Sequence, residues 1–166
     1  MKMTTSLPAL LLIIAALFIT PTYAASSAPL AYIPNEKSGS VSIIETMTQK
    51  VVDTITTGGA PRGIVVSPDG KLLYVSDRNA NGLVVIDLAS QKVISRIPLG
   101  ESPEGVSISP DGRWVVAAIE LTNSVAFIDT ATQRVDFSIK TAGKNPEHAE
   151  FSPDGRWLLV SAEEAD

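Results

Sequence analysis

Hydrophobic residues occur along this chain in short runs that are separated by small groups of turn residues. Leu72–Val75 and Leu83–Ile86 are continuously apolar, whereas polar and apolar side chains alternate in Arg134–Ile139. Continuous runs of this length are typical of strands buried on both faces, and alternation is typical of strands with one exposed face. The pattern therefore predicts an all-β protein with buried middle strands and half-exposed outer strands.

A tetrapeptide marks the turns between these runs. Ser67-Pro68-Asp69-Gly70 recurs as Ser109–Gly112 and Ser152–Gly155, in steps of 42 and 43 residues. Proline and aspartate favour the central positions of a tight turn, and glycine accepts the positive φ with which such a turn ends. Apolar runs precede and follow each copy, so each copy is predicted to close a β-hairpin. The aspartates are predicted to be turn formers and not catalytic groups.

The length of the repeat distinguishes between the known repeat architectures. Four short strands in about 42 residues are typical of a propeller blade, whereas ankyrin, tetratricopeptide and HEAT units are helical. The sequence therefore predicts a β-propeller of four-stranded antiparallel blades. Trp114 and Trp157 each begin a second strand and are predicted to pack inside their blades.

Alignment of the repeats predicts the blade boundaries. Tyr32 matches Tyr74 of a second strand, so the first blade, residues 30–57, lacks its innermost strand. Blade 2 is expected at residues 58–99, blade 3 at 100–141 and a partial blade 4 at 142–166. We expect an incomplete arc of about three to three and a half blades. The arc is either a fragment of a longer propeller, which we favour, or one of two copies that form a ring. Its open blade edges favour self-association.

The first residues have the features of a secretory signal peptide. Lys2 is followed by the apolar stretch Leu7–Ile19 and by small residues at Thr22 and Ala24. We expect cleavage after Ala24, so that residues 1–24 are removed and the mature chain begins at residue 25. The apolar stretch is shorter than the roughly 20 residues of a membrane span, so no stable membrane anchor is predicted. These features predict a periplasmic or secreted protein.

Composition excludes several classes of function. The formal net charge is −5 and there is no basic cluster, so nucleic acid is not a predicted partner. The absence of cysteine excludes a disulfide framework, a thiolate metal site and a Cys-x-x-Cys-His haem attachment. The chain contains no P-loop, Gly-x-Ser-x-Gly, His-Glu-x-x-His or Rossmann motif. No catalytic residue, enzymatic activity or metal site is therefore predicted, and no cofactor is evident.

Differences between the repeats point to a candidate site at one mouth of the central channel. Pro61-Arg62-Gly63 and Pro103-Glu104-Gly105 have the same pattern, which Pro146-Glu147-His148 breaks. We expect these residues in the loops that enter the innermost strands, where loops of successive blades converge. The predicted ligand-binding residues are Arg62, Glu104, Glu147 and His148. Imidazole and carboxylate groups also suit several divalent ions, although the carboxylates could equally be solvated.

The repeat resembles a known family. Tyr74-Val75-Ser76-Asp77, Val85-Ile86-Asp87 and the Ser67–Gly70 turn, at this spacing, resemble the YVTN family of β-propeller repeats. The resemblance extends from residue 30 to residue 166 and implies an exported propeller. The family is similar to the haem d1 domain of cytochrome cd1, and to propellers associated with quinoprotein-dependent catabolism. In haem d1 propellers an axial histidine lies near the start of an innermost strand, which is similar to the position of His148.

Three functions are compatible with these features. We favour a binding scaffold for a protein or redox partner at the channel mouth. The resemblance implies a second function, which is a cofactor-binding propeller, of the haem d1 or quinoprotein-associated type, in periplasmic electron transfer. The third is a hydrolase similar to metal-dependent lactonases, in which acidic and amide side chains hold a central divalent ion. Visible absorbance of a bound cofactor and metal analysis would distinguish the three.

Overall fold

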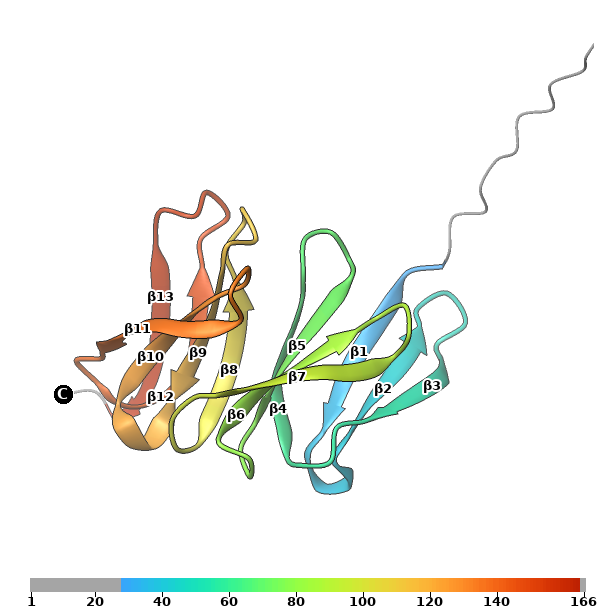
Figure 1. Cartoon of the computed structure of the whole chain (residues 1–166), viewed down its shortest axis with the longest axis horizontal. Helices are drawn as coiled ribbons and strands as arrows, with labels where there is room; N and C mark the ends of the chain where they lie inside the picture. The colour runs from blue at the N-terminus through green and yellow to red at the C-terminus, as the bar shows by residue number, and fades with distance from the viewer. Residues whose placement is uncertain (1–27, 165–166) are drawn as a thin grey trace, which may run out of the picture.

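The chain folds into four small antiparallel sheets that follow one another along an arc (Figure 1). A computed structural model describes residues 28–164, so the predicted signal peptide lies outside the described residues. The sheets are the blades of a β-propeller, and their strands follow one another in chain order from the innermost strand outwards. The predicted fold class, an incomplete arc of four-stranded antiparallel blades, is confirmed.

Two blades have four strands each. Blade 2 contains β4 (Pro61–Val66), β5 (Leu72–Asp77), β6 (Gly82–Asp87) and β7 (Lys92–Pro98). Blade 3 contains β8 (Pro103–Ile108), β9 (Trp114–Ile119), β10 (Ser124–Asp129) and β11 (Arg134–Lys140). Blade 1 contains β1 (Leu30–Asn35), β2 (Ser40–Glu45) and β3 (Lys50–Thr56), and blade 4 contains β12 (Lys144–Phe151) and β13 (Leu158–Glu164). Two single-turn 3-10 helices, η1 (Glu36–Ser38) and η2 (Glu120–Thr122), join second to third strands.

The turns that close the first two strands of a blade have the conformation that the repeated tetrapeptide predicts. The amide of Gly70 donates a hydrogen bond of 2.8 Å to the carbonyl of Ser67, and Gly70 has a φ of +70°. The carboxylate of Asp69 accepts hydrogen bonds from the hydroxyl of Ser67 at 2.6 Å and from the amide of Lys71 at 3.1 Å. The Ser67 hydrogen bond is the main reason why the pKa of Asp69 lies below its usual value. Asp69 therefore acts as a turn former.

Neighbouring blades pack through alternate residues of their middle strands. One face of β6 buries Val84 and Ile86 against blade 1, and the other face buries Leu83 and Val85 against blade 3. These four side chains are at most 1% exposed. Because each middle strand contributes to two interfaces, it is apolar on both faces, as its continuous apolar run predicts.

The two tryptophans differ in burial. The ring of Trp114 makes edge-to-face contacts with Phe137 at 5.6 Å and with Phe127 at 6.3 Å, so it packs inside blade 3 as predicted. Trp157 occupies the same position in blade 4 but is 65% exposed, so the prediction that it packs inside its blade is wrong. The partners of Trp114 lie on the third and fourth strands of its blade, and blade 4 has only two strands among the described residues.

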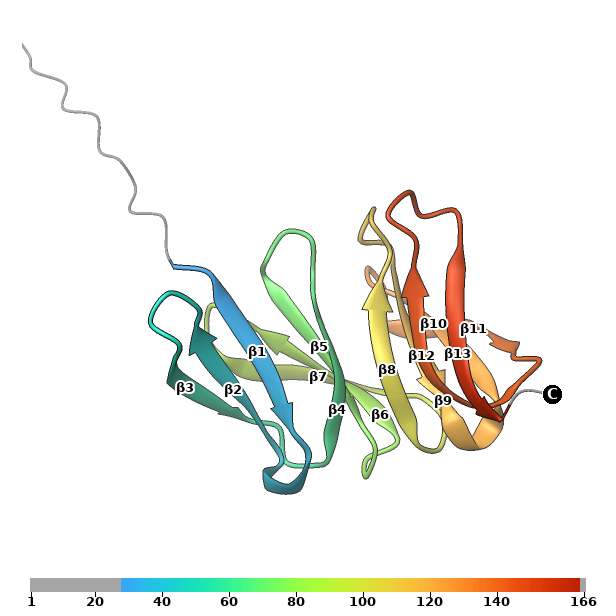
Figure 2. The same cartoon turned by 180° about the vertical axis from the view of Figure 1, so that it is seen from behind.

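The innermost strands β4, β8 and β12 lie side by side along one edge of the arc, which Figure 2 shows from the front. The outermost strands β3, β7 and β11 lie at the opposite edge, and every residue of β11 is exposed. Between residues 28 and 164 no helix has the length and apolar character needed to cross a bilayer. The row of innermost strands positions the candidate site.

Candidate ligand site at the channel mouth

Each innermost strand carries a β-bulge near its start. In β4 the pairing with β5 shifts between Pro61 and Ile64, so that Arg62 and Gly63 together face one residue of β5. β8 and β12 have corresponding shifts. A bulge changes the direction in which side chains point at the end of a strand. The bulges contain or adjoin the four residues that were predicted to bind a ligand, namely Arg62, Glu104, Glu147 and His148.

The sequence placed these four residues in loops that precede the innermost strands, and that placement is wrong. Strand pairing already begins at Pro61, Pro103 and Lys144, so the candidate residues lie inside the strands. The backbone at the site is therefore held by hydrogen bonds to the second strand of each blade. A site on strands is more rigid than a site on loops.

Two glycines allow the innermost strands to lie against one another. A Cβ atom on Gly63 would be 2.5 Å from the carbonyl oxygen of Glu104, and one on Gly105 would be 2.7 Å from that of Glu147. Such a close backbone approach requires glycine. His148 stands at the corresponding position of β12, and no innermost strand among the described residues lies on its far side. Within the described residues 28–164 the side chain of His148 is exposed.

The four predicted residues surround one cavity of about 280 Å³. Arg62 comes from blade 2, Glu104 from blade 3, and Glu147 and His148 come from blade 4. Glu104 is buried, Arg62 and Glu147 are half-buried, and His148 is exposed. Their convergence supports a common site, and their role in ligand binding stays a prediction.

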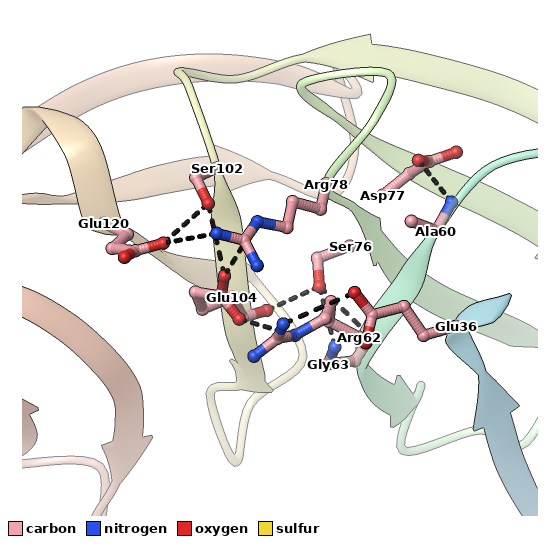
Figure 3. Close-up of polar contacts among 10 residues, drawn as sticks. All are labelled: Glu36, Ala60, Arg62, Gly63, Ser76, Asp77, Arg78, Ser102, Glu104 and Glu120. Carbon is pink, nitrogen blue, oxygen red and sulfur yellow. Dashed lines mark hydrogen bonds and ion pairs between the residues drawn. The ribbon is translucent and has the colours of Figure 1, made fainter.

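Glu104 is the buried centre of a charge network that joins three blades (Figure 3). Its side chain is 3% exposed, and one of its oxygens lies 2.7 Å from Nε of Arg62. Its other oxygen lies 3.7 Å from Nε of Arg78. Arg62 also pairs with Glu36 of η1 at 3.5 Å. Arg62 therefore connects blade 1 to blade 3, and its guanidinium is oriented by two carboxylates.

Hydroxyl groups complete the network. The Ser102 hydroxyl lies 2.7 Å from a carboxylate oxygen of Glu120 and 3.3 Å from one of Glu104. The Ser76 hydroxyl accepts a hydrogen bond of 2.8 Å from the amide of Gly63 and contacts the carbonyl of Glu104 (Figure 3). Ser76 therefore ties the bulge of β4 to the neighbouring strand β8, which fixes the distance between the first two walls of the cavity.

Burial raises the pKa of Glu104 above its usual value of 4.5. The positive charge of Arg62 opposes this shift, the negative charge of Glu147 adds to it, and Arg78 and the Ser102 hydrogen bond oppose it more weakly. The ionised carboxylate is therefore less favourable in the folded protein than in water. A carboxyl group with a raised pKa contributes stability that is present below its unfolded pKa and is lost as the pH rises through its folded pKa.

We therefore expect the wild-type protein to lose stability relative to Glu104→Gln as the pH rises above 4.5. Glutamine has nearly the same shape as glutamate and does not ionise. Subtracting the unfolding free energy of the variant from that of the wild type therefore cancels the titration of all other groups. The difference is measured by urea unfolding of both proteins at a series of pH values. A difference that does not change with pH would show that Glu104 titrates equally in both states.

A second group of carboxylates lies at the rim of the cavity. One oxygen from each of Glu120, Glu147 and Glu163 lies within 4.8 Å of the others. Glu120 is partly neutralised by Arg78 at 3.3 Å, whereas Glu147 makes no ion pair or side-chain hydrogen bond with another residue of the described range 28–164. Among the described residues, these three carboxylates lie close enough together to bind a divalent cation, and their charge also favours a cationic ligand group.

Sequence reasoning did not include Arg78 and Glu120 among the predicted ligand-binding residues, although their spacing contained a signal. They stand 42 residues apart, at the same position of consecutive repeats, and they form an ion pair across the blade interface. Arg62 and Glu104 have the same spacing and also pair. Opposite charges at equivalent positions of neighbouring repeats therefore predict contacts in this fold, because equivalent residues of adjacent blades lie side by side.

The fold and the row of bulged innermost strands define the chain as part of a β-propeller with its candidate site at the channel mouth. A family model described as YNCE-like beta-propeller matches residues 25–109, and the chain belongs to this YNCE-like β-propeller family. No curated protein sequence matches the chain.

Two solved structures are similar to the chain. Hydrazine synthase of Kuenenia stuttgartiensis has a TM-score of 0.78 and 28% identity, over 91% of this chain and 46% of that one. The dihydro-heme d1 dehydrogenase NirN, in complex with DHE, has a TM-score of 0.67 and 22% identity, over 85% of this chain and 32% of that one. The chain thus spans less than half the length of either structure, and the likeness to NirN shows the fold alone.

Proposed function

We propose that this protein is an exported propeller that binds a protein partner, such as a redox protein, at the channel mouth. The observation that carries the proposal is the convergence of Arg62, Glu104, Glu147 and His148 on one cavity. These positions differ between repeats, whereas the glycines and prolines around them maintain the backbone. A rigid frame that presents different side chains is suited to recognition.

Charge indicates which kind of partner group the mouth accepts. The carboxylates of Glu104, Glu120, Glu147 and Glu163 outnumber the guanidinium groups of Arg62 and Arg78 around the mouth. Glu147 is half-buried and makes no ion pair within the described residues, so its carboxylate is available to an incoming cation. A positively charged partner would be attracted before contact, and its association would weaken as salt is added. We therefore expect the partner to present a lysine or arginine side chain to the cavity.

A cofactor is the second candidate ligand, because the exposed imidazole of His148 lines the cavity. Imidazole is a common axial ligand of haem iron, and NirN, whose fold this chain shares, is described as a dihydro-heme d1 dehydrogenase. The cavity volume of about 280 Å³ lies at the small end of ligand pockets and fits a single side chain better than a macrocycle. The volume therefore favours the protein partner over the cofactor.

The test is affinity capture from a periplasmic extract on the immobilised protein. Glu147→Gln is expected to weaken partner binding by about tenfold, which corresponds to roughly 1.4 kcal/mol, because a charge-assisted contact is lost. Asp136→Asn is the matched control, since it makes the same change on the exposed outer strand β11. Equal capture by both variants would contradict the proposal. Adding haem to the wild type and to His148→Ala tests the cofactor hypothesis. This hypothesis requires that the wild type shows a visible absorbance band and that the variant lacks it.

A further inference from the structure

Asp77, the last residue of β5, places a buried carboxylate between blade 2 and the segment that leads into it. The residue is 1% exposed. Its Oδ1 accepts hydrogen bonds from the amide of Ala60 at 3.0 Å, which Figure 3 shows, and from the amide of Ala80 at 3.1 Å. Its Oδ2 is also buried, but has no hydrogen-bond partner among the described residues. One oxygen of this carboxylate is therefore available to a ligand.

The equivalent residue of blade 1 finds its partners within its own blade. Asn35 stands 42 residues before Asp77. Its side-chain amide donates hydrogen bonds to the hydroxyls of Ser42 at 2.9 Å and of Ser40 at 3.3 Å. In blade 1 the polar side chain at the end of the second strand is thus satisfied by two serines of the third strand.

Blade 2 has a cavity of about 120 Å³ where blade 1 has these hydroxyls. The two serine positions are occupied by Gly82 and Val84, which line the cavity and have no side-chain donor. Asp77 and Arg96 are the charged residues of the lining. A buried oxygen beside an apolar wall is unfavourable unless a hydrogen-bond donor reaches it. The cavity therefore has room for a donor that the sequence of blade 2 does not supply.

Arg96 is the second charged group of the cavity. Its Nη1 lies 3.7 Å from Oδ2 of Asp77, which is too far for a hydrogen bond, and its Nη2 donates to the carbonyl of Thr57. A cation in the cavity would meet the like charge of Arg96, and an anion would meet that of Asp77. The side chain of Arg96 is 49% exposed, so the cavity reaches the surface beside it. These features favour a neutral ligand with one donor and one acceptor.

We propose that this cavity binds a small neutral molecule that carries a primary amide. The amide N–H donates to Oδ2 of Asp77, and the amide oxygen accepts from Nη1 of Arg96. Two hydrogen bonds to neighbouring atoms of one planar group add geometric specificity that a single water oxygen does not offer. Ligand pockets for larger molecules begin at about 300 Å³, so this cavity admits only a molecule of a few non-hydrogen atoms.

The residues that build this site occur together in one repeat. The equivalents of Asp77 and Arg96 in blade 3 are Ile119 and Ser138, which have no charge. Gly59 belongs to the same site, because a Cβ atom there would overlap Oδ2 of Asp77. Blade 3 has a glutamate at the position of this glycine. The glycine, the carboxylate and the guanidinium are therefore not part of the common frame of the repeat.

The test compares three molecules of similar shape and different charge, namely acetamide, acetate and acetamidinium. Each is titrated into the isotopically labelled full chain, and binding is followed by the nuclear magnetic resonance signals of the Ala60 and Ala80 amides, which donate to Asp77. We expect a saturable shift with acetamide, and binding of either ion that is weaker by about tenfold or more. Equal shifts with all three molecules, or shifts that do not saturate, would overturn the proposal, because the cavity would then hold water only.

Arg96→Met tests the balance of charge in the cavity. Methionine is also long and unbranched but has no charge, and the half-exposed position tolerates the change. Because Asp77 is then the remaining charge of the cavity, we expect acetamidinium to bind about tenfold more tightly than acetamide. Arg134→Met, on the exposed outer strand β11, is the matched control and is expected to retain the wild-type order. The wild-type order of affinities in Arg96→Met would contradict the proposal.

Val84→Thr tests the location by supplying the donor from within the chain. Its hydroxyl would stand at the position that Ser42 has in blade 1, so we expect it to contact Oδ2 of Asp77 and to abolish acetamide binding. Acetamide binding equal to that of the wild type would place the ligand elsewhere and overturn the proposal. The tripeptide glycyl-glutaminyl-glycine carries the same amide on a polypeptide. Tighter binding of this peptide than of acetamide would overturn a free small molecule as the ligand.

Discussion

Replacing Gly63 by alanine is expected to lower the free energy of unfolding by about 2–3 kcal/mol, which is a large part of the stability of a small domain. The new Cβ atom would lie 2.5 Å from the carbonyl oxygen of Glu104 and 2.6 Å from the amide nitrogen of Val106. Both atoms belong to the backbone of β8, so the clash cannot be relieved by rotation of a side chain. The innermost strands must move apart, which separates Arg62 from Glu104.

The measurement is urea unfolding of Gly63→Ala beside Gly70→Ala. Gly70 lies in an open turn, where an added Cβ would have no atom within 4 Å, but it has a φ of +70°. Alanine at Gly70 is therefore expected to cost only about 1 kcal/mol through its backbone conformation. Equal losses for the two variants would contradict the role of Gly63 as the contact point between blades 2 and 3.

The second large effect is expected at Ile97. Ile97→Ala should lower the unfolding free energy by about 3 kcal/mol, because it removes a side chain that is 4% exposed from the interface between blades 2 and 3. Ile139→Ala removes the same atoms from the equivalent position of blade 3, where the side chain is 53% exposed. We expect a loss below about 1 kcal/mol there, since surface substitutions have small effects.

Thermal and urea unfolding of the two variants measure this contrast directly. The two substitutions remove the same atoms from equivalent positions of equivalent strands. The difference between the two losses of unfolding free energy therefore measures the difference in burial between the two side chains. A loss at Ile139 as large as that at Ile97 would show that this face of blade 3 is buried in solution, either by self-association or by another strand.

The strands and turns could be predicted from the sequence because they depend on local patterns. The continuous run Leu83–Ile86 identified a strand buried on both faces, and the repeated tetrapeptide identified Gly70 as a turn residue with positive φ. Each of these features is determined by a few neighbouring residues. The blade stacking then follows from the repeat, because each apolar face needs a cover.

The bulges and the burial of Trp157 could not be predicted in this way. A bulge depends on the register between two strands, and Arg62 therefore lies inside β4 and not in the loop before it. The exposure of Trp157 depends on which strands of its blade are present, whereas the residue itself looks the same as Trp114 in the repeat. Comparison of the repeats identified the four candidate residues as one group. The buried position of Glu104 between two arginines is visible only in the structure.

The paired charges at the mouth have one further consequence. Equivalent positions of blades 2, 3 and 4 read Arg62, Glu104 and Glu147 in one row, and Arg78, Glu120 and Glu163 in the next. Both rows change from positive to negative between blades 2 and 3, whereas blade 1 places the negative charge of Glu36 at the position equivalent to Arg78. The two arginines of the mouth therefore lie between carboxylates on both sides along the arc. An approaching molecule with separated charges is turned by the field of these charges before contact. The mouth therefore selects the orientation in which a ligand arrives as well as its charge.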